Sequence, residues 1–356
     1  MIKILHSADW HLDSPIQGRS PEQTTLLRKK LLQIPHKVIS AAQAEACDLI
    51  LLAGDLFDGP YTPESLNALR TALEEAQMPV FIAPGNHDYA SPQSPWLREV
   101  WPENVHIFTQ PVMESVALPT LNCRVFGAAF TAAEAPGLLS GFRADCSETA
   151  IGVLHGDPTQ ADSPYCPISS EQVRQSGLSY LALGHIHKGG DFRAGDTLCA
   201  WPGCPMGRGF DELGPKGVLI VTVDDDCQTR FLPLDTPRFY DLECEATDAP
   251  AAALSQVLPA VGSTDFFRIS LTGESEPLDL DGLTAQFSRF PNLLLRDRTV
   301  PPMDLWASAG DDTLEGVYFR MLQQALEGQD EKASEQIRLA AKLSKQLLEG
   351  REVKLP

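Results

Sequence analysis

The chain has 356 residues, of which 43% are hydrophobic and 21% are charged, so it is long enough for two or three domains of roughly 100 to 200 residues each. Its 48 acidic side chains outnumber 28 basic ones and give a formal net charge of −20. This balance excludes a protein that holds polyanions by overall attraction. If the substrate is a nucleic acid, a local site, a bound metal or a partner must supply the attraction.

The cysteines and apolar runs predict where the protein resides. The eight cysteines include no CxxC pair and lack the dense spacing of a secreted disulfide framework, so we expect reduced thiols. The N-terminal apolar run is too short for a signal peptide, and no stretch of about 18 apolar residues could span a membrane. We therefore expect a cytoplasmic protein without a membrane segment.

Short β-rich runs alternate with amphipathic stretches through about residue 230, a pattern typical of an α/β layered domain. Strands are expected at 2–6, 49–53, 80–83, 125–128, 151–155, 181–183 and 218–223. Helices are expected at 24–46 and 63–77, and the second begins with Thr62 before Pro63, a typical helix start.

The pattern changes after Pro237. We expect a small αβ module with strands at 240–244, 266–271 and 293–297 and helices at 250–258 and 280–290. Two prolines at 301 and 302 end it. Two helices follow, one after a cap at Asp312–Thr313 and one over 331–348. The predicted division is an α/β domain over 1–235, a small αβ domain over 238–300 and a C-terminal helical segment over 301–356.

Polar residues that ligate metals follow five of the predicted strands. The segments are Asp9-Trp10-His11, Gly54-Asp55-Leu56-Phe57-Asp58, Gly85-Asn86-His87-Asp88, His155-Gly156-Asp157 and Gly184-His185-Ile186-His187. The carboxyl ends of strands form the binding crevice of an open α/β sheet, and residues i and i+2 share one face of a strand. The candidate ligands are therefore Asp9, His11, Asp55, Asn86, His155, His185 and His187.

Seven candidate ligands exceed what one tetrahedral ion uses, so the pattern predicts two metals with Asp55 as their natural bridge. Two such ions can clamp both oxygens of a phosphoryl displacement and activate a water near neutral pH. Mixed oxygen and nitrogen ligation without thiolate favours manganese or iron over a structural zinc. We expect two divalent ions, with Mn²⁺ first and Fe or Mg²⁺ as alternatives.

Taken together, the motifs DxH, GDxxD, GNHD, HG and GHxH resemble those of the calcineurin-like metallophosphoesterases. The segments 6–12, 53–58 and 184–188, together with the stretch 202–217, resemble the bacterial DNA repair exonuclease branch of that family. The resemblance covers residues 1 to about 230. It implies an α/β fold, a layered β-sandwich flanked by helices, followed by a small αβ capping domain and C-terminal helices.

The resemblance also implies roles for single residues. It places Asp9, His11, Asp55 and His187 on one metal, and Asp55, Asn86, His155 and His185 on the other. His87 then remains free to face the scissile phosphate as a catalytic residue, with Asp88 orienting its ring. Asp13, Asp58 and Asp157 are candidate acceptors that orient imidazoles, whereas His6 is expected to be a packed histidine.

The function implied is that of a hydrolase acting on phosphate esters, a Mn²⁺-dependent DNA phosphodiesterase in repair. Exonuclease activity is expected, and endonuclease activity is left open. The capping domain would shape DNA entry. The C-terminal helices would dock an SMC-like, coiled-coil ABC-type ATPase, although their periodicity alone favours packing on their own domain equally. The sequence contains no GxxxxGK phosphate loop, so any ATP-driven remodelling would come from that partner. A homodimer is left open.

Two other functions compete with this one. A phosphodiesterase or phosphatase for small substrates, such as cyclic nucleotides or nucleotide pyrophosphates, could use the same dinuclear site, and the net charge favours it. A non-catalytic scaffold is disfavoured because all seven ligand positions and His87 hold competent residues.

Overall fold

The computed structural model describes residues 1–16, 20–246 and 249–350. The chain forms two compact units. The larger comprises Met1–Asp241 with Thr264–Phe267, and the smaller comprises Leu242–Ser263 and the chain from Arg268 onward. These units do not coincide with the three predicted domains, whose boundaries stay a prediction.

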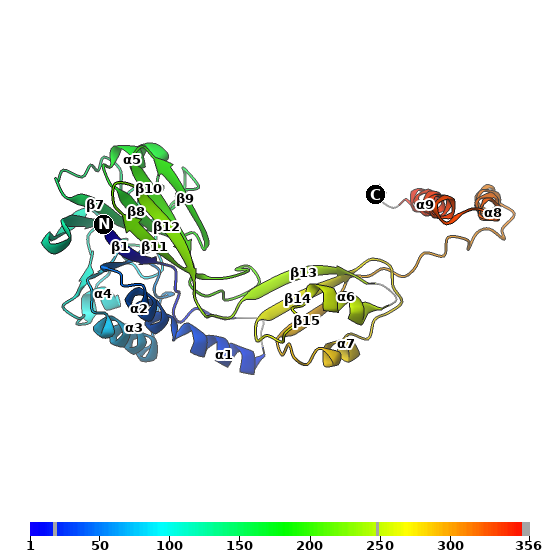
Figure 1. Ribbon diagram of the computed structural model, residues 1–356, viewed down its shortest axis with the longest axis horizontal. Coiled ribbons are helices and arrows are strands. Elements are labelled where there is room, and N and C mark those ends of the chain that lie inside the picture. The colour runs from blue at the N-terminus through cyan, green and yellow to red at the C-terminus, as the bar shows by residue number, and fades with distance from the viewer. Residues whose placement is uncertain (17–19, 247–248, 351–356) are drawn as a thin grey trace. The chain divides into compact units, whose positions relative to one another are not determined.

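Two six-stranded sheets form the frame of the larger unit (Figure 1). The first has the order β12 (Cys227–Pro233), β11 (Gly217–Val223), β1 (Ile2–Ser7), β2 (Leu49–Leu52), β3 (Val80–Ile82) and β4 (Val105–Ile107). The second has the order β5 (Glu114–Leu118), β6 (Cys123–Gly127), β7 (Thr149–His155), β8 (Tyr180–Gly184), β10 (Thr197–Gly203) and β9 (Lys188–Ala194). Strands β1 to β4 are parallel, as are β6, β7, β8 and β10.

The alternation of side chains along the strands produces the layers. Ile4, Leu51 and Phe81 of the first sheet share a buried core with Val153 and Ala182 of the second. The intervening residues of the first sheet point to its other face, where the helices cover them. This arrangement confirms the predicted layered β-sandwich flanked by helices.

The helices of the larger unit are α1 (Pro21–Leu31), α2 (Ile34–Ala44), α3 (Pro63–Glu75), α4 (Pro95–Arg98) and α5 (Ser170–Gln175), with a 3₁₀ turn at Pro119–Leu121. The single helix expected over 24–46 is wrong, because the chain forms two helices there. Pro35 lies in the first turn of α2, where its missing N–H is tolerated; within a continuous helix it would remove a hydrogen bond.

The smaller unit contains most of the third sheet, of order β13 (Phe239–Glu245), β14 (Phe266–Thr272) and β15 (Leu293–Asp297). Its other elements are α6 (Pro250–Val257), α7 (Leu280–Gln286), α8 (Leu314–Ala325) and α9 (Glu331–Leu348). Phe319 and Ala341 are buried where α8 and α9 pack together. Within the described residues, no helix has the length and apolar character needed to cross a bilayer.

His6 is fully buried in β1 and hydrogen-bonded through both ring nitrogens, as expected for a packed histidine. Its Nε2 donates to the Leu183 carbonyl at 3.0 Å, and its Nδ1 accepts from the Tyr180 hydroxyl at 2.8 Å. Burial lowers the pKa of His6 to about 3, so the ring is neutral. We expect Tyr180→Phe to lower the free energy of unfolding by about 1–3 kcal/mol, because Nδ1 loses its buried donor. Urea denaturation measures this, and an unchanged midpoint would contradict it.

Candidate metal centre

The five polar segments meet at one edge of the larger unit. Asp9 and His11 follow β1, Asp55 follows β2, and Asn86 follows β3. His155 is the last residue of β7, and His185 and His187 lie between β8 and β9. The carboxyl ends of three strands of one sheet and two of the other thus present all of these side chains to a common region.

The backbone at these strand ends is held in unusual conformations. Asp9, His11, Asp55 and His185 have φ angles of 56°, 47°, 52° and 94°, in a region that side-chain-bearing residues rarely adopt. Hydrogen bonds of 3.0 Å from the Asp9 amide to the Gly54 carbonyl and 2.9 Å from the His11 amide to the Asp55 carbonyl tie the first two loops together. A Cβ at Gly54 would lie 2.7 Å from the His155 ring, so only glycine fits there.

Asp9, His11 and His187 form the first cluster, with one ligand atom of each within 4.8 Å of the others. The Nε2 atoms of His11 and His187 are 3.0 Å apart. Asp9 is buried, and among the described residues its Oδ2 has no hydrogen-bond partner. Burying a carboxylate oxygen without a hydrogen-bond donor costs free energy. A cation held by these three side chains would give that oxygen a partner.

Asp55 and His155 form the second cluster with Asp9, since one ligand atom of each lies within 4.8 Å of the others, and Asn86 lies beside His155. The His155 Nε2 lies 2.9 Å from Asn86 Oδ1 and 3.3 Å from Asp55 Oδ2. Its Nδ1 donates to the Ala53 carbonyl at 2.9 Å, so Nε2 is the atom available to a metal. Asp55 Oδ2 also lies 3.7 Å from His11 Nε2, and it therefore faces both clusters. The His185 ring is beside that of His155, with 5.3 Å between centroids.

The buried carboxylates of the centre favour a bound positive charge. Burial raises the pKa of Asp9. Burial alone would also raise the pKa of Asp55, but the His155 and His11 rings hold it below its usual value. Asp55 in turn raises the pKa of His155 to about 9 against the opposing effect of burial. Carboxylates packed among imidazole nitrogens in a buried site are a donor set that fits divalent cations.

Two further carboxylates orient the histidines. Asp58 Oδ1 lies 3.1 Å from His11 Nδ1 and 2.6 Å from His87 Nδ1, as expected for an orienting acceptor. Glu212 is buried, and its Oε1 accepts from His187 Nδ1 at 2.8 Å and from the Arg208 guanidinium at 2.6 Å. Sequence reasoning missed Glu212 and Arg208 as site residues. The sequence feature that could have indicated them is that both are charged residues in the glycine-rich stretch after β10.

Asp88 has a different role from the one implied by the resemblance, since Asp58 takes the place beside the His87 ring. The Asp88 carboxylate accepts hydrogen bonds from the backbone amides of Gly85 and Leu56, each at 2.8 Å, and of Asp55 at 3.2 Å. Burial and the nearby Asp55 raise the pKa of Asp88 to about 7. Asp88 therefore links the loops after β2 and β3.

Asp13 and Asp157 also differ from expectation. Asp13 binds the amide and hydroxyl of Thr62 at 2.9 and 3.0 Å and so stabilises the start of α3 rather than an imidazole. Asp157 Oδ2 is 3.9 Å from His185 Nε2, beyond hydrogen-bond distance. Its Oδ1 accepts from the amide and hydroxyl of Thr159 at 2.8 and 2.6 Å.

Glu212→Gln is expected to weaken metal binding about 10–100-fold, because replacing a residue that orients a ligating histidine typically lowers metal affinity by this factor. The amide keeps the shape of Glu212 but loses the charge that faces His187 and Arg208. Equilibrium dialysis with Mn²⁺ measures the change. Glu171→Gln, an exposed substitution on α5, is the matched control. Equal affinity in the Glu212 variant would show that this carboxylate does not support the centre.

Comparison with known proteins identifies the family of the chain. The family model described as calcineurin-like phosphoesterase matches residues 2–189, which include all seven candidate ligands. The chain belongs to the calcineurin-like phosphoesterase family. The family and the fold predicted from the motifs are confirmed.

Three relatives of this phosphoesterase are informative. It is 33% identical to the uncharacterized metallophosphoesterase YhaO of Bacillus subtilis, over 62% of this chain and 57% of that protein. It is 27% identical to the SbcD subunit of the nuclease SbcCD of the same species, over 62% and 66%. It is also 27% identical to the DNA double-strand break repair protein Mre11 of Aeropyrum pernix, over 61% and 56%. The matched region therefore spans less than two thirds of each relative.

Proposed function

We propose that this phosphoesterase is a metal-dependent nuclease that hydrolyses DNA phosphodiester bonds at a two-metal site. The observation that carries the proposal is the pair of donor clusters with Asp55 Oδ2 between them, 3.3 Å from His155 Nε2 and 3.7 Å from His11 Nε2, and the exposed ring of His87 beside them. Two of the relatives are named as a nuclease subunit and a DNA break repair protein, which supports DNA as the substrate. A role in repair and a cytoplasmic location belong to the same proposal.

The proposed ligands are those implied by the motifs: Asp9, His11, Asp55 and His187 for one ion, and Asp55, Asn86, His155 and His185 for the other. When bound, two Mn²⁺ ions would polarise the phosphate and supply a nucleophile near neutral pH. The chain's own contribution is to fix the ligands. Asp58 and Glu212 hold two of the imidazoles by their Nδ1 atoms, and the Ala53 carbonyl holds a third.

His87 is proposed as the group that gives a proton to the leaving oxygen. Its side chain is 45% exposed, and its ring lies 4.8 Å from the His11 ring between centroids. Its Nδ1 bonds to Asp58 and its backbone amide to Asp55 Oδ1 at 2.9 Å. Nε2 is then the ring nitrogen left to serve as an acid beside a departing alkoxide.

The experiment that tests this function is a nuclease assay with end-labelled single- and double-stranded DNA, with and without Mn²⁺. Cyclic nucleotides and a nucleotide pyrophosphate are tested in parallel. Metal-dependent shortening of DNA supports the proposal. Turnover of the small substrates without any DNA cleavage would overturn it and favour the alternative of a small-substrate phosphodiesterase, to which the net charge of −20 is better suited.

We also propose that the C-terminal helices dock an SMC-like ATPase. Apolar side chains are exposed on α8 and α9, with Leu314 at 89%, Leu347 at 66% and Leu348 at 59%, and contiguous exposed apolar surface marks interaction sites. We expect the double substitution Leu347→Glu/Leu348→Glu to abolish co-purification with such a partner while hydrolysis of bis(p-nitrophenyl) phosphate continues. Undiminished co-purification would refute this docking role.

A further inference from the structure

An arginine lies beside the first donor cluster. Arg208 belongs to the loop between β10 and β11, and its Nη2 atom is 3.1 Å from Nδ1 of His187. In residues 1–16, 20–246 and 249–350, no other lysine or arginine side chain lies in such contact with the side chain of a candidate ligand. Burial lowers the pKa of His11, and the charge of Arg208 contributes in the same direction. The charge of Arg208 therefore acts on both histidines of this cluster.

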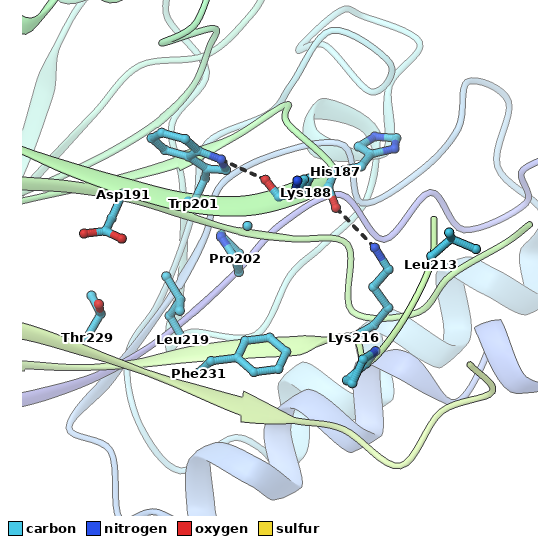
Figure 2. A pocket seen from close by; sticks show the side chains of 13 residues that line it. His187, Lys188, Asp191, Trp201, Pro202, Leu213, Lys216, Leu219, Thr229 and Phe231 are labelled. Carbon is cyan, nitrogen blue, oxygen red and sulfur yellow. Dashed lines mark hydrogen bonds between the residues drawn. The ribbon is translucent and has the colours of Figure 1, made fainter. Parts of the chain in front are cut away.

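The loop that carries Arg208 is fixed against the segment of His187. The Cys204 amide donates to the His187 carbonyl oxygen at 3.4 Å, and Lys216 Nζ lies 3.5 Å from the same oxygen (Figure 2). The His187 ring points away from Lys216 in Figure 2. Lys216 therefore faces the backbone of this segment, whereas Arg208 lies beside the ring.

Glu212 holds one side of the Arg208 guanidinium. Its Oε1 accepts from Nη2 at 2.6 Å, and its Oε2 accepts from Nε at 3.3 Å and from the Arg208 amide at 2.7 Å. The carboxylate balances the charge of the guanidinium, so the pair adds no net charge beside the first cluster. A guanidinium carries five N–H donors in a rigid fork, and Glu212 occupies only those on the side of Nε and Nη2.

The other side of the guanidinium is open. Within the described residues, Nη1 forms no hydrogen bond and is not one of the buried unpaired atoms, and the Arg208 side chain is 20% exposed. Burial would lower the pKa of Arg208, but Glu212 above all, and also Asp58, raise it above its ordinary value. Arg208 thus presents charged donors to solvent beside the metal ligands.

We propose that Arg208 binds a non-bridging oxygen of the scissile phosphate through Nη1, while Glu212 holds its other side. Phosphate oxygens are anionic acceptors that suit the donors of a guanidinium, and a phosphodiester bound at this centre brings such oxygens close to His187. This inference rests on the proposed function and adds a substrate-binding residue to it. An ammonium is a compact point charge, so a lysine could not hold Glu212 through two nitrogens and present a third to the substrate.

The test compares the wild-type protein with Arg208→Gln in the full chain with Mn²⁺. The value of kcat/KM for bis(p-nitrophenyl) phosphate is expected to fall about 10–100-fold, the effect of losing one hydrogen bond to a charged group. The affinity of the Mn²⁺-loaded protein for inorganic phosphate, measured by isothermal titration calorimetry, is expected to fall by a similar factor. The number of bound Mn²⁺ ions is expected to stay that of the wild type.

Arg174→Gln is the matched control. Arg174 is exposed on α5 and pairs with Glu171 at 2.5 Å, so the substitution removes the same group from an ion pair that contains no candidate ligand. We expect it to keep the wild-type kcat/KM, phosphate affinity and metal content.

Arg208→Lys separates phosphate binding from support of Glu212. If Arg208→Gln loses Mn²⁺, the lysine variant keeps a positive charge opposite Glu212 and is expected to bind Mn²⁺ like the wild type. Its affinity for phosphate is still expected to be about tenfold lower, because the ammonium lacks the second arm of the fork. A wild-type phosphate affinity in the Mn²⁺-loaded lysine variant would show that Arg208 does not act through Nη1, and the inference would be overturned.

The outcomes also separate this inference from the proposed function. If the wild-type protein hydrolyses bis(p-nitrophenyl) phosphate and Arg208→Gln keeps both kcat/KM and the phosphate affinity, Arg208 does not bind the phosphate and only the inference fails. If the wild-type protein hydrolyses that diester but cleaves no DNA, the nuclease function fails, and a loss of phosphate affinity in Arg208→Gln still supports the contact.

Discussion

Replacing Asp55 with asparagine is expected to lower kcat/KM for bis(p-nitrophenyl) phosphate with Mn²⁺ by at least about a hundredfold, since each ion contributes several kcal/mol of transition-state stabilisation. Asp55 Oδ2 lies 3.3 Å from His155 Nε2 and 3.7 Å from His11 Nε2, so one oxygen serves both clusters. Asparagine keeps the size of the side chain and removes the charge that would hold two cations there.

Asp196→Asn is the matched control for the Asp55 variant. Asp196 is exposed in the turn between β9 and β10, at the opposite end of β9 from His187, and its substitution makes the same change in charge. Metal analysis of both variants is expected to show a loss of bound Mn²⁺ with Asp55→Asn alone. Near-normal turnover by a folded Asp55→Asn protein would end the assignment of this residue as a bridge.

Replacing His87 with glutamine is expected to have a different signature, in which both ions stay bound and kcat falls about 10²–10⁴-fold, the usual range for a lost general acid. His87 lies beside the clusters and is held through its Nδ1 by Asp58 at 2.6 Å. Because that acceptor also binds His11, Asp58→Asn is expected to impair metal binding as well as turnover.

Metal content and kcat must therefore be measured on the same preparations of the His87→Gln and Asp58→Asn proteins. A His87→Gln protein that has lost one ion would show that this histidine is a ligand, and the proton-donor role would then be withdrawn. A fully loaded His87→Gln protein with wild-type kcat would remove His87 from the mechanism altogether.

The location of the candidate site was predictable because each candidate ligand follows a short apolar strand. Parallel strands end at the same edge of a sheet, so Asp9, Asp55 and Asn86 had to converge. The sequence does not show that a second sheet brings His155 and His187 to the same edge. The order of the motifs indicated this only through their resemblance to a known family.

The supporting residues were much harder to predict. Glu212 is 25 residues from His187 in the chain, and its contact depends on how the loop after β10 folds back. Asp88 lies beside His87 in sequence, yet its carboxylate points to the amides of Leu56 and Gly85. Adjacent residues often point in opposite directions, and only the tertiary structure shows which histidine each carboxylate contacts.

The strands at the edges of the two sheets could not be predicted from local pattern. Strands β9, β10 and β12 were themselves missing from the expected elements. As strands at or near sheet edges, they lack the long apolar runs that indicate a buried strand.

The most direct test of the central claim is the number of Mn²⁺ ions bound by the wild-type chain at saturation, measured by equilibrium dialysis with metal analysis. The shared position of Asp55 between the two clusters predicts two ions per chain in the wild-type protein, with the second lost in Asp55→Asn. Saturation at one ion, or at two ions that both survive loss of Asp55, would contradict a bridged two-metal centre.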